Sequence, residues 1–430
     1  MLTVKNYTGF SKVLISFKIK LYTFFHFTGQ LIQGRIKLKY FLRVLKRLLF
    51  FLSYMRDNKY SKIGKRIKIH LYLPGFPSKA FFHACNKVVE FDKKMPGISV
   101  LISVTSACRY KCPHCYQKHD KGKDMDINVL VETVKKLQDK GVAFINIEGG
   151  EPFLVFDRLK KVCDAIDERS EILINSTGDG MTFENLSELK KNKNIIGIMF
   201  SLHNDKPEDM NRFTGIENAW KNLEKGIELC HKVGLAVTFN TCLLRESFYN
   251  GTFENIMEIA KDFNGSILQL IKPKPAGGWL ESGIEDFSKE DIEHITNKVH
   301  KYNLAKSHRD YTFISPMIIE ESAEVFGCTA GGTDRFYINA KGDLQACEFL
   351  NISFGNIQTD DFDIIYDKMR EVFKTPCQSW LCEKHSRQIL KLKETNNLSS
   401  LPLTPEISKQ IYENWDRTDF TDFYQKLKEL

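Results

Sequence analysis

Residues 98–117 read ISVLISVTSACRYKCPHCYQ, and this stretch indicates both the fold class and the chemistry of the chain. Its first part, residues 98–105, is a run of β-branched and apolar residues that predicts a buried strand. Directly behind it stand Cys108, Cys112 and Cys115. A loop that leaves the C-terminal end of a buried strand is where parallel α/β proteins gather their reactive groups. We therefore expect the three thiols to meet in one site.

The strand is the first of six predicted strand–helix units. Asp126 is placed as the N-cap of a helix that begins at Ile127. Further strand-like runs lie at 143–147, 172–175, 196–201, 235–242 and 267–271, and helical patterns lie near 156–168, 183–192, 217–233, 251–263 and 288–303. Repeated β-α-β units predict a parallel sheet with helices outside. Six units are fewer than the eight of a closed barrel, so the predicted fold is α/β, either an incomplete (β/α)6 TIM-like barrel or an open sheet.

Three neighbouring thiols admit two interpretations. A 4Fe–4S cluster is normally held by four thiolates, so three would leave one iron open to a substrate or cofactor. A Cys-x2-Cys pair is also common in zinc sites, where His114 or His119 would supply a further ligand. The second strand favours the first interpretation, because it is followed by Glu148-Gly-Gly-Glu-Pro. Two glycines let the backbone turn tightly and expose its polar groups to a ligand.

The pair of motifs, Cys-x3-Cys-x2-Cys after the first strand and Gly-Gly-Glu-Pro after the second, resembles the radical S-adenosylmethionine (SAM) superfamily over roughly residues 98–305. The resemblance implies that Cys108, Cys112 and Cys115 hold a 4Fe–4S cluster and are catalytic. It also implies that the fourth iron binds SAM, which is cleaved reductively to a 5′-deoxyadenosyl radical that removes hydrogen from a substrate. The same resemblance assigns Gly149, Gly150 and Glu151 to the methionyl amino group.

Further SAM contacts are implied at neighbouring positions. The family often has an aromatic residue before the third cysteine, and here that position is His114, with Tyr116 next to the thiol. Asn175 and Ser201 end the third and fourth predicted strands. Arg212 stands about where relatives place an arginine for the SAM carboxylate, which suits the fork of a guanidinium. The loop after the sixth strand adds Lys272, Lys274 and Trp279, either as contacts of an anionic substrate or as parts of a surface loop.

A second set of cysteines lies near the C-terminus. Residues 336–347 read as a β-hairpin with a Lys-Gly turn. Four thiols are confined to this region, which matches the ligand count of one closed 4Fe–4S cluster; they are Cys328, Cys347, Cys377 and Cys382. The stretch is similar to the SPASM and twitch extensions of radical SAM enzymes. SPASM has seven cysteines, so a shortened form with one auxiliary cluster is implied. His385 is an alternative to Cys382 as the fourth ligand, and a zinc site is the structural alternative.

Charge divides the chain unevenly. The 430 residues carry a net charge of +8, yet residues 1–80 hold 17 Lys and Arg and one acidic residue, Asp57. Such a split predicts a basic attachment segment in front of an acidic domain. An apolar stripe of helical period occupies residues 40–55, formed by Phe41, Val44, Leu45, Leu48, Leu49 and Leu52. With Arg43, Lys46 and Arg47 between, it is typical of an interfacial membrane helix. The alternative is a helix packed on the main domain.

Composition excludes other classes of protein. At 42% hydrophobic residues the chain is globular, and eleven cysteines, an odd number, argue against a secreted disulfide framework. The longest uncharged stretch of the basic segment, residues 21–34, is too short and polar to span a bilayer. No nucleic-acid-binding module accompanies the charge, so nucleic acid is not an expected partner. We expect a cytoplasmic protein, peripheral on the inner face of the membrane through residues 1–80.

These interpretations predict four parts: a basic amphipathic segment (1–95), a radical SAM partial barrel (96–305), a small α+β auxiliary-cluster domain (306–390) and a helical tail (391–430). The predicted function is SAM-dependent hydrogen abstraction from a peptide or a membrane-associated lipid. The expected partner is a reduced flavodoxin- or ferredoxin-like electron donor. The alternative function is an iron–sulfur electron carrier or a zinc-structured binding protein without radical chemistry.

Overall fold

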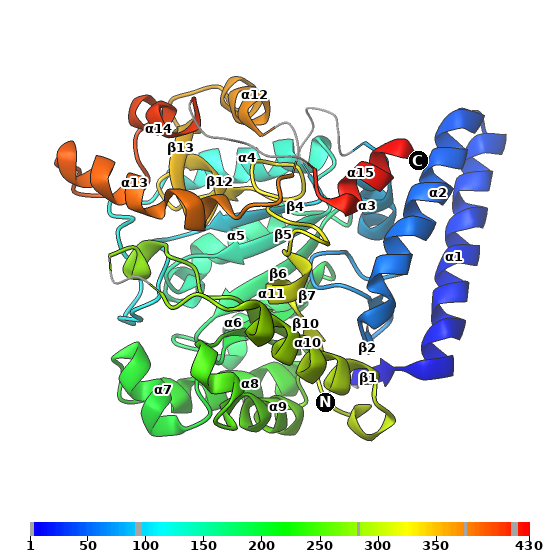
Figure 1. The fold of residues 1–430 in the computed structure, drawn as a ribbon, viewed down its shortest axis with the longest axis horizontal. Helices are drawn as coiled ribbons and strands as arrows, with labels where there is room; N and C mark the ends of the chain where they lie inside the picture. The colour runs from blue at the N-terminus through cyan, green and yellow to red at the C-terminus, as the bar shows by residue number, and fades with distance from the viewer. Residues whose placement is uncertain (1–3, 91–96, 282–283, 374–375, 414–419) are drawn as a thin grey trace.

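One curved ten-stranded sheet forms the centre of the molecule (Figure 1). The computed structural model describes residues 4–90, 97–281, 284–373, 376–413 and 420–430. The strand order of the ten-stranded sheet is β10-β9-β8-β7-β6-β5-β4-β11-β12-β13. The parallel part comprises β4 (Ser99–Ser103), β5 (Phe144–Glu148), β6 (Glu171–Ser176), β7 (Ile195–Ser201), β8 (Ala236–Cys242), β9 (Ile267–Ile271) and β10 (Phe313–Ser315). The predicted fold class, an incomplete α/β barrel, is confirmed.

The sheet is larger than the sequence pattern predicts. All six predicted strands are present, and β10 adds a seventh that pairs in parallel with β9. This strand has only three residues, too few to produce a recognisable alternation of apolar side chains. Because β10 lies behind the predicted boundary at residue 305, the parallel sheet continues past that boundary. Of the other two predicted boundaries, the one between residues 95 and 96 lies outside the described residues, and the one between residues 390 and 391 falls within the helix Leu381–Thr395.

Six helices lie where the six units predict them, and one further helix, Pro207–Thr214, is not predicted. They are α4 (Ile127–Asp139), α5 (Phe156–Asp164), α6 (Phe183–Lys190), α7 (Pro207–Thr214), α8 (Ala219–Val233), α9 (Thr252–Asp262) and α10 (Lys289–Leu304). Local chemistry fixes their ends. The side chain of Asp126 accepts a hydrogen bond from the Asn128 N–H and so caps α4. Gly234, in the left-handed region that favours glycine, ends α8.

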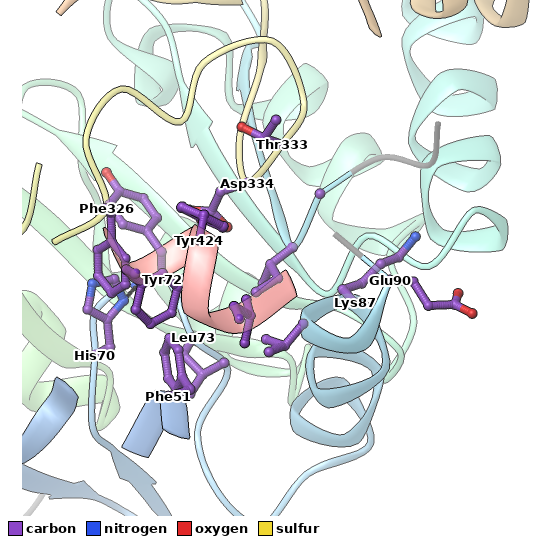
Figure 2. A pocket seen from close by; sticks show the side chains of 15 residues that line it. Phe51, His70, Tyr72, Leu73, Lys87, Glu90, Phe326, Thr333, Asp334 and Tyr424 are labelled. Carbon is purple, nitrogen blue, oxygen red and sulfur yellow. Dashed lines mark hydrogen bonds between the residues drawn. The ribbon is translucent and has the colours of Figure 1, made fainter. Parts of the chain in front are cut away.

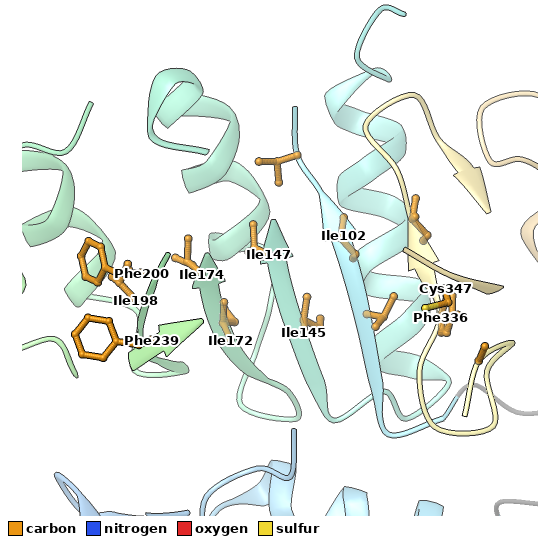
Figure 3. Packing of buried hydrophobic residues seen from close by; sticks show 14 of the residues in the cluster. Ile102, Ile145, Ile147, Ile172, Ile174, Ile198, Phe200, Phe239, Phe336 and Cys347 are labelled. Atoms are coloured by element: carbon orange, nitrogen blue, oxygen red, sulfur yellow. The ribbon is translucent and has the colours of Figure 1, made fainter. Parts of the chain in front are cut away.

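Isoleucines of neighbouring strands pack in register beneath these helices (Figure 3). Ile102 pairs with Ile147, and Ile147 pairs with Ile174, on three successive strands. All three are fully buried. Burial of each such side chain contributes about 1.5–3 kcal/mol of hydrophobic free energy. This apolar layer fixes the register of the strands and therefore the positions of the loops that leave their C-terminal ends.

The C-terminal region continues the same sheet. Strand β11 (Tyr337–Ile338) pairs in parallel with β4, and the predicted hairpin forms between β11 and β12 (Asp343–Cys347). The sheet ends at β13 (Leu350–Asn356). The remaining helices are α11 (Met317–Glu320), α12 (Phe362–Val372), α13 (Leu381–Thr395), α14 (Pro405–Tyr412) and α15 (Asp422–Glu429). The hairpin region is therefore attached to the barrel through main-chain hydrogen bonds to its first strand.

The N-terminal segment forms a small separate layer. It consists of β1 (Val4–Tyr7), α1 (Gly9–Ile32), α2 (Leu38–Tyr54), β2 (Tyr60–Ile63), β3 (Arg66–Lys68) and α3 (Lys79–Val89). Its three strands form a sheet of their own. In Figure 1, α1 and α2 run side by side at the edge of the molecule, with α15 next to α2. Among the described residues, no helix is long and apolar enough to cross a membrane.

The apolar stripe predicted for residues 40–55 largely faces the protein. Phe41, Val44, Leu48 and Leu52 are buried in a cluster with residues of α1, α3 and α15. Only Leu49 of the six stripe residues is exposed. This stripe therefore packs on the molecule, as the alternative interpretation requires, because three neighbouring helices cover it.

Candidate active site

A cavity of about 830 Å³ lies at the C-terminal ends of the parallel strands. Ligand sites of proteins commonly have this size and position. Nine of the residues predicted for the catalytic site line it: Cys108, Cys112, His114, Cys115, Tyr116, Gly149, Gly150, Asn175 and Ser201. Lys272, Lys274 and Trp279 line it as well. The structure thus brings together side chains that lie far apart in the sequence.

The cysteine loop is held at both ends. At its start, the Asp124 carboxylate accepts hydrogen bonds from the Thr105 hydroxyl (2.6 Å) and the Ser106 N–H (2.9 Å). At its end, the Gly278 N–H donates to the carbonyl oxygen of Cys115 (2.9 Å). A Cβ at residue 278 would lie 1.9 Å from the Pro113 oxygen, so only glycine fits there. The loop after β9 therefore fixes the thiol loop that follows β4.

The glycine loop is docked directly on the cysteine loop. The Gly150 N–H donates to the Thr105 carbonyl (2.8 Å), and the Glu151 N–H donates to the Ala107 carbonyl (2.7 Å). A Cβ at Gly150 would lie 2.2 Å from the Ala107 oxygen. The two motifs that stand after successive strands thus share one hydrogen-bonded wall of the cavity.

Glu151 lies behind this wall. Its buried carboxylate accepts hydrogen bonds from the Phe153 N–H, the Ser176 hydroxyl, and the N–H and hydroxyl of Thr177. It does not line the cavity, and burial raises its pKa to about 7. With both oxygens engaged by four donors, Glu151 positions the turn after β6. This arrangement differs from the direct contact with an ammonium group that the sequence predicts.

The three thiols lie close enough to influence one another. Desolvation by the surrounding residues, together with the neighbouring thiols, raises the pKa of Cys108 to about 11 and that of Cys112 to about 12. At neutral pH the thiols are therefore protonated unless a cation favours the thiolate, as bound iron does. Among the described residues, no three His, Cys, Asp or Glu side chains are grouped closely enough to hold a single metal ion. In a cluster each thiolate binds a different iron, so convergence on one point is not required.

Aromatic rings surround His114. Its ring stacks on Phe213 with centroids 4.9 Å apart, and it meets His203 edge-on at 4.5 Å. Trp279 lies at 5.5 Å. Burial lowers the pKa of His114 to about 4, so the imidazole is neutral. These flat apolar surfaces at the cavity wall suit a heteroaromatic ring such as adenine. Sequence reasoning assigned no role to Phe213, and nothing local to it indicates one.

Three amide oxygens at the cavity lack hydrogen-bond partners. They are Oδ1 of Asn175 on β6, Oδ1 of Asn240 on β8 and Oε1 of Gln117 in the cysteine loop, all buried and without a partner in the described part of the chain. Buried polar atoms in native proteins are normally satisfied, so such atoms at a cavity indicate a ligand. Arg212 lies elsewhere: its side chain is 77% exposed, pairs with Asp209 at 2.9 Å and is absent from the cavity wall.

A buried acidic pair connects the cavity with the hairpin region. Glu148 accepts hydrogen bonds from Tyr116 and Asn175, and burial together with Glu348 raises its pKa to about 8. Glu348 in turn accepts a hydrogen bond from the Cys347 thiol at 3.1 Å. Sequence reasoning assigned no role to either acid. The sequence signal that could have indicated them is their position, because Glu148 directly precedes Gly149 and Glu348 directly follows Cys347.

The four C-terminal cysteines gather at one place. Cys328 and Cys377 form a two-residue antiparallel bridge, and a hydrogen bond from the Cys377 thiol lowers the pKa of Cys328 to about 6. Electrostatic repulsion couples Cys328 to Cys382 and Cys382 to Cys347. His385, one turn further along α13, shares a hydrogen bond of 3.2 Å with Gln388 of its own helix. Of the two alternative fourth ligands, Cys382 is the one that is electrostatically coupled to the other thiols.

A smaller cavity lies between the N-terminal segment and α15 (Figure 2). Its volume is about 60 Å³, room for a few water molecules. His70, Tyr72 and Tyr424 line it, and His70 lies 3.1 Å from Glu320. It contains no thiol, and its size excludes a nucleotide, so it is not a competing active site.

Comparison with known proteins identifies the family. Residues 102–264 match the radical SAM superfamily. A probable GTP 3′,8-cyclase of Methanocaldococcus jannaschii is 28% identical over 58% of this chain and 84% of its own length. An AdoMet-dependent heme synthase of Oleidesulfovibrio alaskensis is 21% identical over 64% of this chain and 76% of its own length. Streptococcus suis SuiB, solved with its precursor peptide SuiA, has a TM-score of 0.53 at 16% identity, over 66% of this chain and 68% of its own.

A partial barrel with a cysteine loop behind its first strand defines a radical SAM protein. Residues 102–264 form such a radical SAM domain, and the chain is an enzyme, as the sequence predicts; the likeness to SuiB shows a shared fold. The superfamily implies a 4Fe–4S cluster and SAM as cofactors. The thiols, the glycine wall and the unpaired amides fit these groups. His119, the other zinc ligand considered, lies 3.4 Å from Glu281 and does not line the cavity, which disfavours the zinc alternative.

Proposed function

We propose that Cys108, Cys112 and Cys115 hold the catalytic cluster, and that the cavity beside them binds SAM and the substrate carbon from which hydrogen is removed. The observation that carries this proposal is the shared wall of the cavity, whose volume is about 830 Å³. In this wall the thiol loop and the glycine loop hydrogen-bond to each other. When bound, the cluster and SAM supply one-electron chemistry that ends in hydrogen abstraction.

The residues of this chain would bind and orient the two cofactors. Gly149 and Gly150 offer backbone groups to the methionyl part, while Asn175, Ser201 and Asn240 offer polar groups along the strand ends. His114, with Phe213 and Trp279, offers a surface for adenine, and Tyr116 orients Glu148 by a hydrogen bond. Arg212 would reach SAM only after leaving Asp209, so we assign it no contact.

The thiol assignment is tested by anaerobic reconstitution with iron, sulfide and SAM under a strong reductant. The wild type should form 5′-deoxyadenosine, and Cys112→Ala should form none because one iron loses its ligand. Cys85→Ala is the matched control, since this buried thiol lies among the hydrophobic residues of the N-terminal segment. Product from Cys112→Ala, or zinc in place of iron in the wild type, contradicts the proposal.

We further propose that Cys328, Cys347, Cys377 and Cys382 hold one auxiliary 4Fe–4S cluster. The electrostatic coupling of these thiols supports it, because Cys328 is coupled to Cys377 and Cys382, and Cys382 is coupled to Cys347. The wild type should then contain about eight irons per chain, and Cys347→Ala about four. Comparison of Cys382→Ala with His385→Ala decides the fourth ligand: only the former should lose iron. Four irons in the wild type would contradict the auxiliary cluster.

The proposed substrate is a peptide. Support comes from the cavity wall opposite the thiols, where Lys272 and Lys274 pair with Glu383, and from the likeness to SuiB, which was solved with a precursor peptide. Side chains of both charges can recognise a polypeptide, whereas an acyl chain needs an apolar channel. Transfer of deuterium from a deuterated peptide into 5′-deoxyadenosine tests this. Transfer of deuterium from a deuterated lipid instead would favour the lipid substrate.

The proposed electron donor is an acidic flavodoxin- or ferredoxin-like protein. Cys108 is exposed, and the exposed residues around the thiol loop are basic: Arg109, Lys111, Lys118, Lys121 and Lys123. Complementary charge raises association rates. Lys111→Glu with Lys121→Glu should slow protein-driven reduction at least about tenfold at low salt, while dithionite-driven cleavage stays unchanged. Lys301→Glu with Lys306→Glu, exposed at the other end of the strands, is the control. Equal slowing by both pairs contradicts this surface.

A further inference from the structure

Helix α1 exposes a long apolar face to its surroundings. Its inner side is buried through Ile19, Thr23 and Phe27. On its outer side, Phe10 is 76% exposed and Ile32 is 80% exposed. The residues between them that share this side are Val13, Leu14, Phe17, Leu21 and Phe25, all exposed. From Phe10 to Phe25 they recur at three- and four-residue spacing, and Ile32 follows Phe25 after two turns, so they share one side of the helix. We call these seven residues the α1 face.

Such a helix is apolar on two sides, which is unusual for one that meets water. Helices that are hydrophobic all round are normally covered, and exposed apolar patches of this kind mark interaction surfaces. The rest of the N-terminal segment, α2 and α3 above all, covers the inner side only, and in Figure 1 α1 is the outermost element at its edge of the molecule. Something outside the described chain must therefore cover the α1 face.

Charge indicates what covers it. Residues 1–56 contain eleven Lys and Arg and no acidic residue. Those beside the α1 face are solvent-exposed, among them Lys18, Lys37, Lys39 and Lys46. Leu42 and Leu49 of α2 add exposed apolar groups between the cations. A second copy of the chain would bring two such positive surfaces together, which repel. An anionic surface with an apolar interior satisfies both features.

We propose that the α1 face lies in the headgroup–acyl boundary of a bilayer that contains anionic phospholipids. The phenylalanines and leucines of α1 enter the acyl boundary, and the surrounding lysines and arginines contact the phosphates. This proposal assigns membrane contact to α1, whereas the sequence indicated residues 40–55. The contact is interfacial, because the helix lies flat along the surface of the molecule.

The position of the N-terminal segment sets the orientation. It contacts the barrel where the strands begin: Arg66 pairs with Glu171 at the start of β6, and the Ser61 hydroxyl donates to the Ser266 carbonyl just before β9. The cavity lies at the opposite ends of the same strands. A protein bound through α1 therefore turns its active site away from the bilayer. Given the proposed function, this orientation suits a substrate that arrives from the aqueous side.

Flotation of the full-length protein with vesicles tests the proposal. The probes are phosphatidylcholine vesicles with and without about one-third phosphatidylglycerol. The wild type should float with the anionic vesicles at least about tenfold more than with neutral ones, and raised salt should reduce binding severalfold. Phe17→Gln with Phe25→Gln, which leaves the charge unchanged, should lower binding at least about tenfold.

A matched double variant and a second readout keep the test decisive. Phe183→Gln with Ile364→Gln removes two apolar residues that are 49% and 59% exposed, against 62% for both Phe17 and Phe25, and that lie on α6 and α12; it should bind like the wild type. Equal loss in both double variants overturns the proposal, as does a wild type that stays unbound. A wild-type dimer that the α1 variant converts to monomer would assign the face to self-association and also overturn it. Formation of 5′-deoxyadenosine should be equal in all three proteins, and its absence from the wild type would contradict the proposed function alone.

Discussion

Some buried polar groups where the parallel strands end lack the protein partners that Glu171 has where the strands begin. Where the strands begin, Glu171 is fully buried, yet its carboxylate lies 2.7 Å from Lys68, 3.1 Å from Arg66 and 2.9 Å from the Gly75 N–H. Where the strands end, the side-chain oxygen of Asn240 and Nδ1 of His114 are buried without a hydrogen-bond partner in the described residues.

This difference distinguishes buried polar groups that stabilise the fold from buried polar groups that bind a ligand. A buried charge with complete partners stabilises one arrangement, since loss of any partner leaves the others desolvated and unpaired. An unpaired polar group costs stability and is retained where a ligand completes it. Substitutions at the strand starts should therefore affect unfolding, and substitutions at the strand ends should affect ligand binding.

The largest effect is expected at the strand starts. Glu171→Gln leaves the Lys68 ammonium without its buried counter-charge, and should lower the free energy of unfolding by about 3–5 kcal/mol. Urea denaturation of the purified protein measures this. Lys79→Ala breaks the exposed pair with Glu168, whose side chains are 64% and 63% exposed, and should cost at most about 1 kcal/mol. Equal losses in the two variants would contradict the distinction.

A smaller effect of the opposite kind is expected at Asn240. Asn240→Ala removes an amide whose oxygen has no protein partner, so the melting temperature should stay within a few degrees. SAM binding, measured by equilibrium dialysis, should weaken about 10–100-fold, which corresponds to about 1.4–2.8 kcal/mol. A loss of stability without a loss of affinity would show that Asn240 belongs to the core.

The smallest effect is a pH dependence at the strand starts. Burial lowers the pKa of Lys59 to about 7, and its amine donates to the carbonyls of His308 (2.7 Å) and Tyr311 (2.8 Å). Between pH 7 and 10 the unfolded chain holds a proton that the folded chain lacks, so stability rises with pH by about 1 kcal/mol per unit. Unfolding of the wild type and of Lys59→Met at pH 7, 8 and 9 should diverge accordingly; parallel curves would contradict the lowered pKa.

The sequence predicted the features that depend on local patterns of residues. Runs of β-branched residues located the six strands, and the spacing of the cysteines and glycines located the loops at their ends. It did not predict the pairing of β11 with β4 or the ring of His203 and Phe213 around His114, because these depend on contacts between distant segments. The stripe at residues 40–55 shows a further limit: apolar periodicity indicates a covered face, but it does not indicate whether protein or lipid covers it.

The pairing of β11 with β4 has a consequence for electron flow. The strand that precedes the first thiol loop and the hairpin that carries Cys347 belong to one hydrogen-bonded ladder. Rates of electron tunnelling fall steeply with distance, and the rigid backbone between the two proposed clusters would keep that distance constant. With both clusters in place, entry of a bulky substrate would therefore be accommodated by the loops after β9, since a shift of the hairpin would alter the tunnelling path during every turnover.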